Sequence, residues 1–106
     1  MRGKFQVKIA RQAETDLAEI WAYIAGDRVD NENEFTLKLE TRMKTLANSP
    51  RRCPLIPENE ILGTQYRHLI LGKYRAVYRI SSETVYVLRI IHGARLLDTS
   101  LIEGKV

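Results

Sequence analysis

The sequence contains one cysteine, Cys53, among 106 residues. One thiol cannot form an internal disulfide, and no cluster of metal-ligating residues surrounds it. No apolar run approaches the roughly 20 residues that span a bilayer, and the first residues lack the apolar stretch of a secretory signal. These absences argue against a disulfide framework and a membrane protein. They favour the cytoplasm, and the length of 106 residues predicts a single domain over residues 1–106.

Motifs for phosphate, metal or redox chemistry are also missing. The sequence has no glycine-rich phosphate loop, no HExxH motif and no CxxC pair. We therefore expect no metal and no cofactor. Any reaction that this protein catalysed would have to use its own side chains.

Positive charge is concentrated in the last third of the chain. Residues 1–65 hold ten Lys/Arg and ten Asp/Glu, whereas residues 66–106 hold seven Lys/Arg and three Asp/Glu, so the net charge of +4 arises entirely there. A one-sided basic field attracts anionic partners such as nucleic acid or an acidic protein segment. A solvated basic face is the alternative explanation.

Hydrophobic periodicity predicts the order β-α-α-β-β-β. Residues 5–9 alternate between apolar and polar, as in a half-buried strand. Helical spacing follows over 11–25 and over 30–48. The apolar stripe of the first helix is Ala13, Leu17, Ile20, Trp21 and Ile24, and that of the second is Phe35, Leu39, Met43 and Leu46.

Pro50 ends the second helix, and Pro54 and Pro57 mark residues 51–62 as an ordered loop. Three strands follow at 66–71, 73–80 and 84–91. The short links at Gly72 and at residues 81–83 indicate antiparallel neighbours. The predicted fold class is α+β, a small twisted antiparallel sheet with an N-terminal helical hairpin packed on one face. The first strand is expected at the sheet edge, and the strand over 84–91 in the centre. Residues 96–106 form either a short docked helix or a mobile end.

Arginines recur on these last strands. Arg75 and Arg79 share one face of their strand, while Tyr74 and Tyr78 share the other. With the helices covering one face, the other is predicted to be a shallow basic floor edged by aromatic rings. Guanidinium groups bind phosphate bidentately, and rings stack on unpaired bases.

A metal-independent RNA-cleaving site would need cations around the phosphate and a proton-transfer group. Arg75 and Arg95 could supply the charge, and His92 could transfer the proton, because histidine is the side chain type that ordinarily changes charge near neutral pH. Possible acids are Tyr66, Tyr74 and Tyr78, and Glu58 could fold over the sheet from its loop. The alternative for His92 is a purely structural role.

The chain resembles the RelE/ParE superfamily of type II toxins over nearly its whole length. The resemblance rests on several short stretches in the same order: Asp16-Leu17 with Ile20-Trp21, Ser49-Pro50, Tyr74-Arg75 with Tyr78-Arg79, and Ile91-His92-Gly93-Ala94-Arg95. It implies the β-α-α-β-β-β fold and a cognate antitoxin that folds over the toxin in a hetero-oligomer. RelE-like members cleave messenger RNA on the ribosome, and ParE-like members poison DNA gyrase.

The resemblance favours the ParE-like, plasmid-stabilisation branch. Arg75, Arg95 and approximately Arg67 match basic positions of RelE-like members, but Leu69 replaces a lysine and Leu101 replaces a C-terminal tyrosine. We therefore expect a gyrase inhibitor that arrests growth and is not itself an enzyme. The alternatives are a ribosome-dependent endoribonuclease using Arg75, His92 and Arg95, or a non-toxic interaction module. Residues expected to bind target or antitoxin are Arg67, Arg75, Tyr78, Arg79, Arg89 and Arg95.

Overall fold

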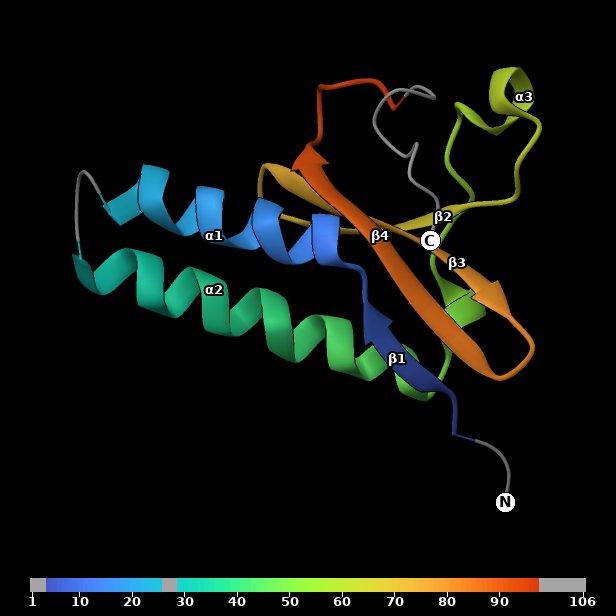
Figure 1. Ribbon diagram of the computed structural model, residues 1–106, viewed down its shortest axis with the longest axis horizontal. Helices are drawn as coiled ribbons and strands as arrows, with labels where there is room; N and C mark the ends of the chain where they lie inside the picture. Colours follow the sequence, from blue (N-terminus) through green and yellow to red (C-terminus); the bar gives the residue numbers. More distant parts are fainter. Residues whose placement is uncertain (1–3, 26–28, 98–106) are drawn as a thin grey trace.

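The computed structural model describes residues 4–25 and 29–97, although not the side chains of residues 24–36. The long elements are β1 (Gln6–Ile9), α1 (Arg11–Ala25), α2 (Val29–Lys44), β2 (Arg67–Leu71), β3 (Tyr74–Ser81) and β4 (Thr84–His92). Short helical turns lie between α2 and β2. The predicted α+β class and the order of the main elements are confirmed (Figure 1).

The four strands form one mixed sheet in the order β1-β4-β3-β2. β2, β3 and β4 are antiparallel neighbours, whereas β1 lies parallel to β4, with Val7 opposite Val85. The edge position of the first strand and the central position of β4 are as predicted, but the expectation of a purely antiparallel sheet is wrong at this edge. Parallel pairing is possible here because the chain returns through two helices instead of a tight turn.

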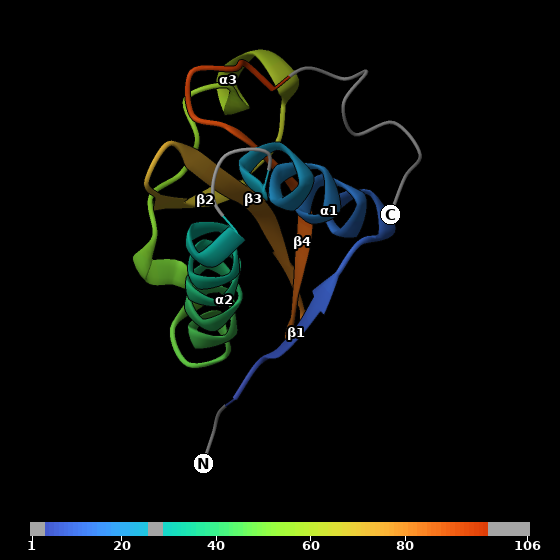
Figure 2. The ribbon, with the colours of Figure 1, turned by 90° about the vertical axis from the view of Figure 1, so that its left-hand side faces the viewer.

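The helical hairpin covers one face of the sheet, as Figure 2 shows end-on. Its core side chains are Ala13 and Ile20 from α1, Leu39 and Met43 from α2, and Leu46 from the 3-10 turn Thr45–Ala47. They pack on Ala76, Tyr78, Val85 and Val87 of the sheet. Each large buried side chain contributes roughly 1.5–3 kcal/mol, so this interface provides most of the stability.

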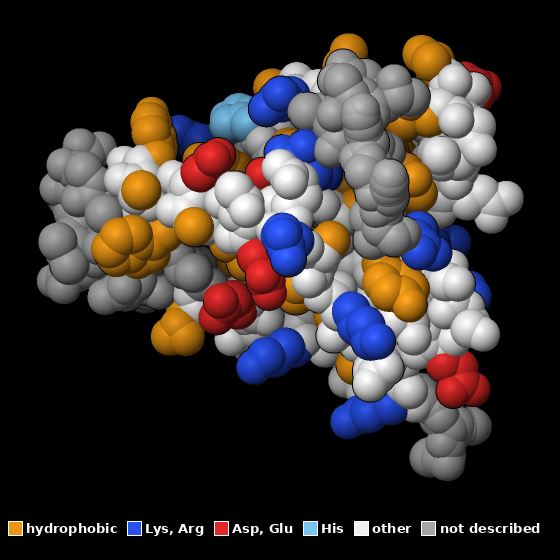
Figure 3. All heavy atoms as spheres, viewed as in Figure 1, with side chains coloured by type: hydrophobic (Ala, Val, Ile, Leu, Met, Phe, Trp, Pro, Cys, Tyr) orange, Lys and Arg blue, Asp and Glu red, His pale blue; other side chains and the backbone are white. Residues whose placement is uncertain are grey.

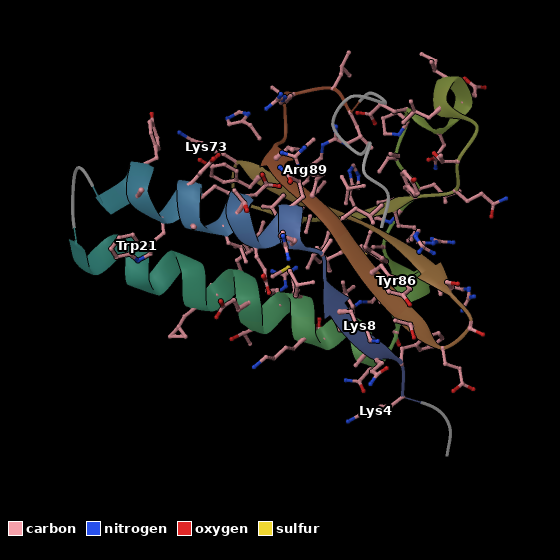
Figure 4. All side chains as sticks on the ribbon, in the orientation of Figure 1. Lys4, Lys8, Trp21, Lys73, Tyr86 and Arg89 are labelled. Atoms are coloured by element: carbon pink, nitrogen blue, oxygen red, sulfur yellow. The ribbon has the colours of Figure 1, made fainter. Side chains whose placement is uncertain are left out.

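The predicted apolar stripes are largely confirmed, with one exception. Trp21 is 42% exposed instead of buried, because it lies on the part of α1 that extends beyond the sheet (Figure 4). Side chains of Ile24 and Phe35 lie outside the described residues. No helix in the described part of the chain is long and apolar enough to cross a membrane.

Two tight reversals set the register of the meander. Gly72 has φ +59° between β2 and β3, and Ser82 has φ +57° between β3 and β4. Positive φ is inexpensive for glycine and less common for serine. A β-bulge in β4 at Leu88 shifts its register, so that Val77 faces Arg89 while Tyr78 faces Val87.

The second face of the sheet is covered at one end. The segment predicted as a plain loop contains the 3-10 turn Pro50–Arg52 and the short helix α3 (Asn59–Leu62). Ile56, Leu62, Tyr66 and Leu97 from this segment and the C-terminal region pack over Val77 and Ile91. The predicted open basic floor is therefore wrong at this end, where a second small core occupies the face. The tail predictions for residues 98–106 lie outside the described residues.

Candidate functional site

Arg75 lies beneath the covering segment, and only 4% of it is exposed. Its guanidinium forms an ion pair with Glu58, through Nη1 to Oε1 at 3.3 Å and through Nη2 to Oε2. Nη2 also donates to the carbonyl of Arg95 at 2.7 Å, and Nη1 lies 3.1 Å from Nδ1 of His68. Glu58 in turn accepts the N–H of Leu97 at 2.9 Å. Arg75 therefore joins the sheet to both covering segments.

These contacts shift the ionisation of two groups. The hydrogen bond from Arg75 lowers the pKa of Glu58 from 4.5 to about 2, against the opposing effect of burial. Burial, together with the positive charge of Arg75, lowers the pKa of His68 below 6.5. At neutral pH the site therefore holds a carboxylate, a guanidinium and an uncharged imidazole. As the sequence suggested, Glu58 folds over the sheet.

The lowered pKa of His68 makes stability depend on pH. Below about pH 6.5 the unfolded chain binds a proton at His68 that the folded chain does not bind, so the free energy of unfolding falls as the pH falls. We expect His68→Gln to flatten this dependence between about pH 7 and 5. Urea unfolding at several pH values measures it. His92→Gln, at an exposed histidine, is the matched control, and an unchanged slope in His68→Gln would contradict the assignment.

Arg89 is engaged in a second buried pair, with Asp16 of α1. Nε donates to Oδ2 at 2.7 Å and Nη2 to Oδ1 at 2.8 Å, while the backbone N–H of Ile90 donates to Oδ2 at 2.9 Å. Figure 4 places Arg89 between α1 and the end of β4. β1 pairs with β4 only as far as Val87. Beyond that point Asp16 accepts the backbone N–H of Ile90, and this hydrogen bond links α1 to the edge of β4.

Arg67 and Tyr78 also hold internal segments. Nη1 of Arg67 donates to the carbonyl oxygens of Cys53 at 2.6 Å and Arg51 at 3.1 Å. The hydroxyl of Tyr78 donates to the carbonyl of Pro50, and burial raises the pKa of this phenol. Tyr78 is fully buried, so neither surface binding nor proton transfer to a substrate is open to it in this conformation.

His92 and Arg95 remain at the surface. Together with Tyr74 they line a shallow cavity of about 190 Å³ beside α1. The ring of Tyr74 meets the His92 ring edge-to-face with centroids 5.7 Å apart. Nδ1 of His92 accepts the N–H of Ala94 at 3.2 Å, which leaves Nε2 to carry the proton of the neutral ring.

The predicted site residues therefore fall into three groups by burial. Arg75, Tyr78 and Arg89 are buried, Arg67 and Arg79 are half-buried, and Arg95 is exposed. His92 and Arg95 come together as predicted, but Arg75 is directed into its own ion pair and only the backbone of Arg95 reaches it. Arg79 lies toward the far end of β3, with its guanidinium 4.4 Å from the ring centroid of Tyr86.

Positive side chains also follow the β1 edge. In Figure 3, Lys and Arg run down this face over β1 and β4, while Asp and Glu lie mainly over the helices. Lys4 and Lys8 are labelled along β1 in Figure 4. Among the described residues, no group of three or more His, Cys, Asp or Glu is arranged to hold a metal ion. The positive edge can attract an anionic partner.

Comparison with known proteins identifies relatives of this fold. A family model described as ParE toxin of the type II toxin–antitoxin system parDE matches residues 7–97. A protein of the chromosomal ParDE system from P. aeruginosa has a similar fold, with a TM-score of 0.68 and 21% identity over 84% of this chain and 96% of that chain. The toxin–antitoxin complex RelBE2 from Mycobacterium tuberculosis contains a chain with a TM-score of 0.56 and 25% identity, covering 90% of this chain and 98% of that chain. No curated protein matches the sequence.

Proposed function

This chain belongs to the ParE toxin family of type II toxin–antitoxin systems, and on that premise we propose that it inhibits DNA gyrase. Inhibition of gyrase would block replication and arrest growth until a cognate antitoxin neutralises the toxin. If a plasmid encoded both proteins, cells that lost the plasmid would stop growing, and the plasmid would be retained in the growing population. Gyrase acts on bacterial DNA, so we place the protein in the cytoplasm.

The burial of Arg75 is the observation that carries this proposal. A metal-independent nuclease needs several cations directed at the scissile phosphate, and the guanidinium of Arg75 is directed instead at Glu58. Releasing it would leave a buried carboxylate without its partner, which is costly. A binding toxin needs no such release, because its effect comes from contacts alone.

We propose that the exposed side chain of Arg95 contacts the target. Arg95 adjoins α1 across the shallow cavity that Glu19 and Tyr23 also line. The backbone of Arg95 is fixed by its carbonyl hydrogen bond to Arg75. A buried ion pair thus positions an exposed cation. In this view Arg75 supports binding without touching the target.

A ribosome-dependent endoribonuclease is the second candidate. The grouping of His92, Tyr74 and Arg95 around one cavity favours it, since these side chains offer a proton-transfer group and a cation. In this mechanism His92 would be indispensable. A non-toxic interaction module would need neither group.

The relatives of similar fold come from toxin–antitoxin systems, which supports an antitoxin as the partner of this chain. We propose a hetero-oligomer in which an extended antitoxin segment folds on the toxin surface. Such a segment gains affinity from the large surface that it covers. Part of this gain is offset by the conformational entropy that the segment loses when it becomes ordered.

Induced expression of the chain in bacteria without an antitoxin tests the target. We expect growth arrest with induction of the SOS response and intact messenger RNA. His92→Gln should arrest growth equally well, because gyrase binding requires no proton transfer. Rapid message cleavage that His92→Gln abolishes would instead establish the nuclease. Normal growth in cells that contain the folded protein would favour the non-toxic module.

A further inference from the structure

A cavity of about 470 Å³ opens between the last turn of α2, the 3-10 turn Pro50–Arg52 and β2. We call it the α2–β2 cavity. Its polar lining residues are Arg42, Thr45, Arg52 and His68, and its apolar wall includes Leu69 and Ile70. In Figure 2 the segment that follows α2 passes beside this helix on its way to β2. The cavity shares no lining residue with the one that contains His92 and Arg95.

The charge of the α2–β2 cavity is positive. Two of its lining residues are arginines, and none of its lining residues, all of which the structure describes, is Asp or Glu. Arg42 and Arg52 are both exposed, and neither is ion-paired with a carboxylate in the described part of the chain. The cavity therefore attracts an anionic ligand.

A chain of hydrogen bonds fixes one basic wall against the other. Nη2 of Arg52 donates to the hydroxyl oxygen of Thr45 at 2.9 Å, and this hydroxyl donates to the carbonyl oxygen of Arg42. The chain uses one N–H donor of Arg52 and only the backbone of Arg42. It holds the guanidinium of Arg52 beside the last turn of α2 while its other N–H groups stay available to a ligand.

His68 supplies a further donor from β2. Nδ1 of its ring lies 3.1 Å from Nη1 of Arg75. A guanidinium nitrogen can only donate, so Nδ1 accepts and the neutral ring carries its proton on Nε2. Nε2 is the ring nitrogen that Arg75 does not use. Because His68 lines the cavity and Arg75 does not, the Nε2–H group is available to a ligand there.

These donors match a terminal phosphate better than other common anions. A phosphate monoester presents three acceptor oxygens and about two negative charges at neutral pH. Each guanidinium can bind two of these oxygens side by side, and the imidazole N–H can reach the third. A carboxylate or a phosphodiester offers two such oxygens and one charge, so it would satisfy fewer of the donors.

Apolar surface forms the rest of the wall. Ile70 is 56% exposed, and Leu69 and Pro54 also line the cavity. The volume lies within the range of small-molecule sites, roughly 300–1,000 Å³. A bare phosphate ion would leave most of this volume and the apolar wall unused. An organic group attached to the phosphate would cover Ile70 and gain from its burial.

We propose that the α2–β2 cavity binds a small organic phosphate monoester. The phosphate lies between Arg42, Arg52 and His68, and the apolar part of the ligand packs against Ile70. This binding requires neither gyrase nor an antitoxin, so it stands or fails independently of the proposed function.

Phenyl phosphate is the first probe, because it joins a phosphate monoester to a small apolar ring. Isothermal titration calorimetry with the purified folded protein should detect its binding. Inorganic phosphate, which lacks the ring, and methyl phenyl phosphate, which is a diester, should each bind at least about fivefold more weakly. Equal affinities for phenyl phosphate, inorganic phosphate and sulfate would show a general attraction of anions and overturn the proposal. Absence of phenyl phosphate binding at millimolar concentration would also overturn it.

Variants of the basic wall locate the phosphate. Arg42→Gln and Arg52→Gln should each weaken phenyl phosphate binding about tenfold. Arg51→Gln is the matched control, because Arg51 is the exposed neighbour of Arg52 but lines a different cavity. It should change the affinity by less than about twofold. Equal weakening in Arg51→Gln and Arg52→Gln would mean that overall charge attracts the ligand, which contradicts a specific site.

Two variants of His68 test the proposed Nε2–H donor. The amide of asparagine reaches about as far as Nδ1, and that of glutamine about as far as Nε2. His68→Asn can therefore still accept from Arg75 but loses the outer donor, whereas His68→Gln retains it. We expect at least about threefold weaker binding of phenyl phosphate in His68→Asn than in His68→Gln, with circular dichroism showing both to be folded. Equal binding would contradict the contact with Nε2–H.

The phosphate of the ligand can belong to a small compound or to the 5′ end of a nucleic acid. Adenosine 5′-monophosphate and a 5′-phosphorylated single-stranded oligonucleotide that begins with adenosine separate these sources. Affinities within about threefold of each other would support the small ligand. If the oligonucleotide bound at least about a hundredfold more tightly and its 5′-hydroxyl counterpart did not, the occupant would be a nucleic-acid end and the proposal would be wrong.

Discussion

Truncating Glu58 to alanine is expected to lower the free energy of unfolding by about 3–5 kcal/mol. The substitution leaves the guanidinium of Arg75, which is 4% exposed, buried without its counter-charge. It also removes the acceptor for the N–H of Leu97, so the C-terminal region loses a contact to the sheet. Urea unfolding followed by circular dichroism measures the change.

The double variant Glu58→Leu with Arg75→Met is the matched control. Replacing a buried ion pair by apolar residues often costs little, so the double variant should be more stable than Glu58→Ala. The lowered pKa of Glu58 means that the pair stabilises the fold above about pH 4.5 and that this stabilisation is lost as the pH falls toward about 2. The double variant should lack this acid-dependent loss. Equal urea midpoints for wild type and Glu58→Ala would contradict the account.

Asp16→Ala is the second large destabilisation, also of about 3–5 kcal/mol. Asp16 accepts two hydrogen bonds from Arg89 and one from the backbone of Ile90. Its loss leaves a buried guanidinium and an unsatisfied strand N–H, and it releases α1 from the edge of β4. Thermal and urea unfolding should both detect the effect.

Two variants on the same helix separate charge from geometry. Asp16→Asn retains an oxygen for the N–H of Ile90 but loses the charge, so its cost should lie between those of wild type and Asp16→Ala. Glu19→Ala removes an exposed carboxylate and should change stability by less than about 0.5 kcal/mol. An Asp16→Ala protein as stable as Glu19→Ala would show that the buried pair contributes nothing to stability.

Periodicity was sufficient to predict the strands, the two long helices and the residues of the main core. Apolar residues at helical spacing, such as Leu39 and Met43, are buried as expected. The short links at Gly72 and Ser82 correctly indicated the meander. The parallel pairing of β1 was not predictable, because alternation along a strand carries no information on the direction of its neighbour.

The partners of the arginines could not be predicted in the same way. Arg75 and Glu58 are 17 residues apart, and Arg89 and Asp16 are 73 apart, so no local pattern connects them. The sequence did hold one signal for the second pair. Asp16 lies on the same helical face as Ala13 and Ile20, and a carboxylate within an apolar stripe requires a buried partner. The pattern of strand arginines therefore predicts a binding surface, whereas Arg75 and Arg89 form buried ion pairs within the protein.

The most direct test of the central claim is the supercoiling activity of purified DNA gyrase in the presence of the purified folded protein. The account predicts that the protein inhibits supercoiling, that His92→Gln inhibits equally, and that exposed Arg95→Ala inhibits less. Undiminished supercoiling at a large excess of folded wild-type protein would contradict gyrase as the target.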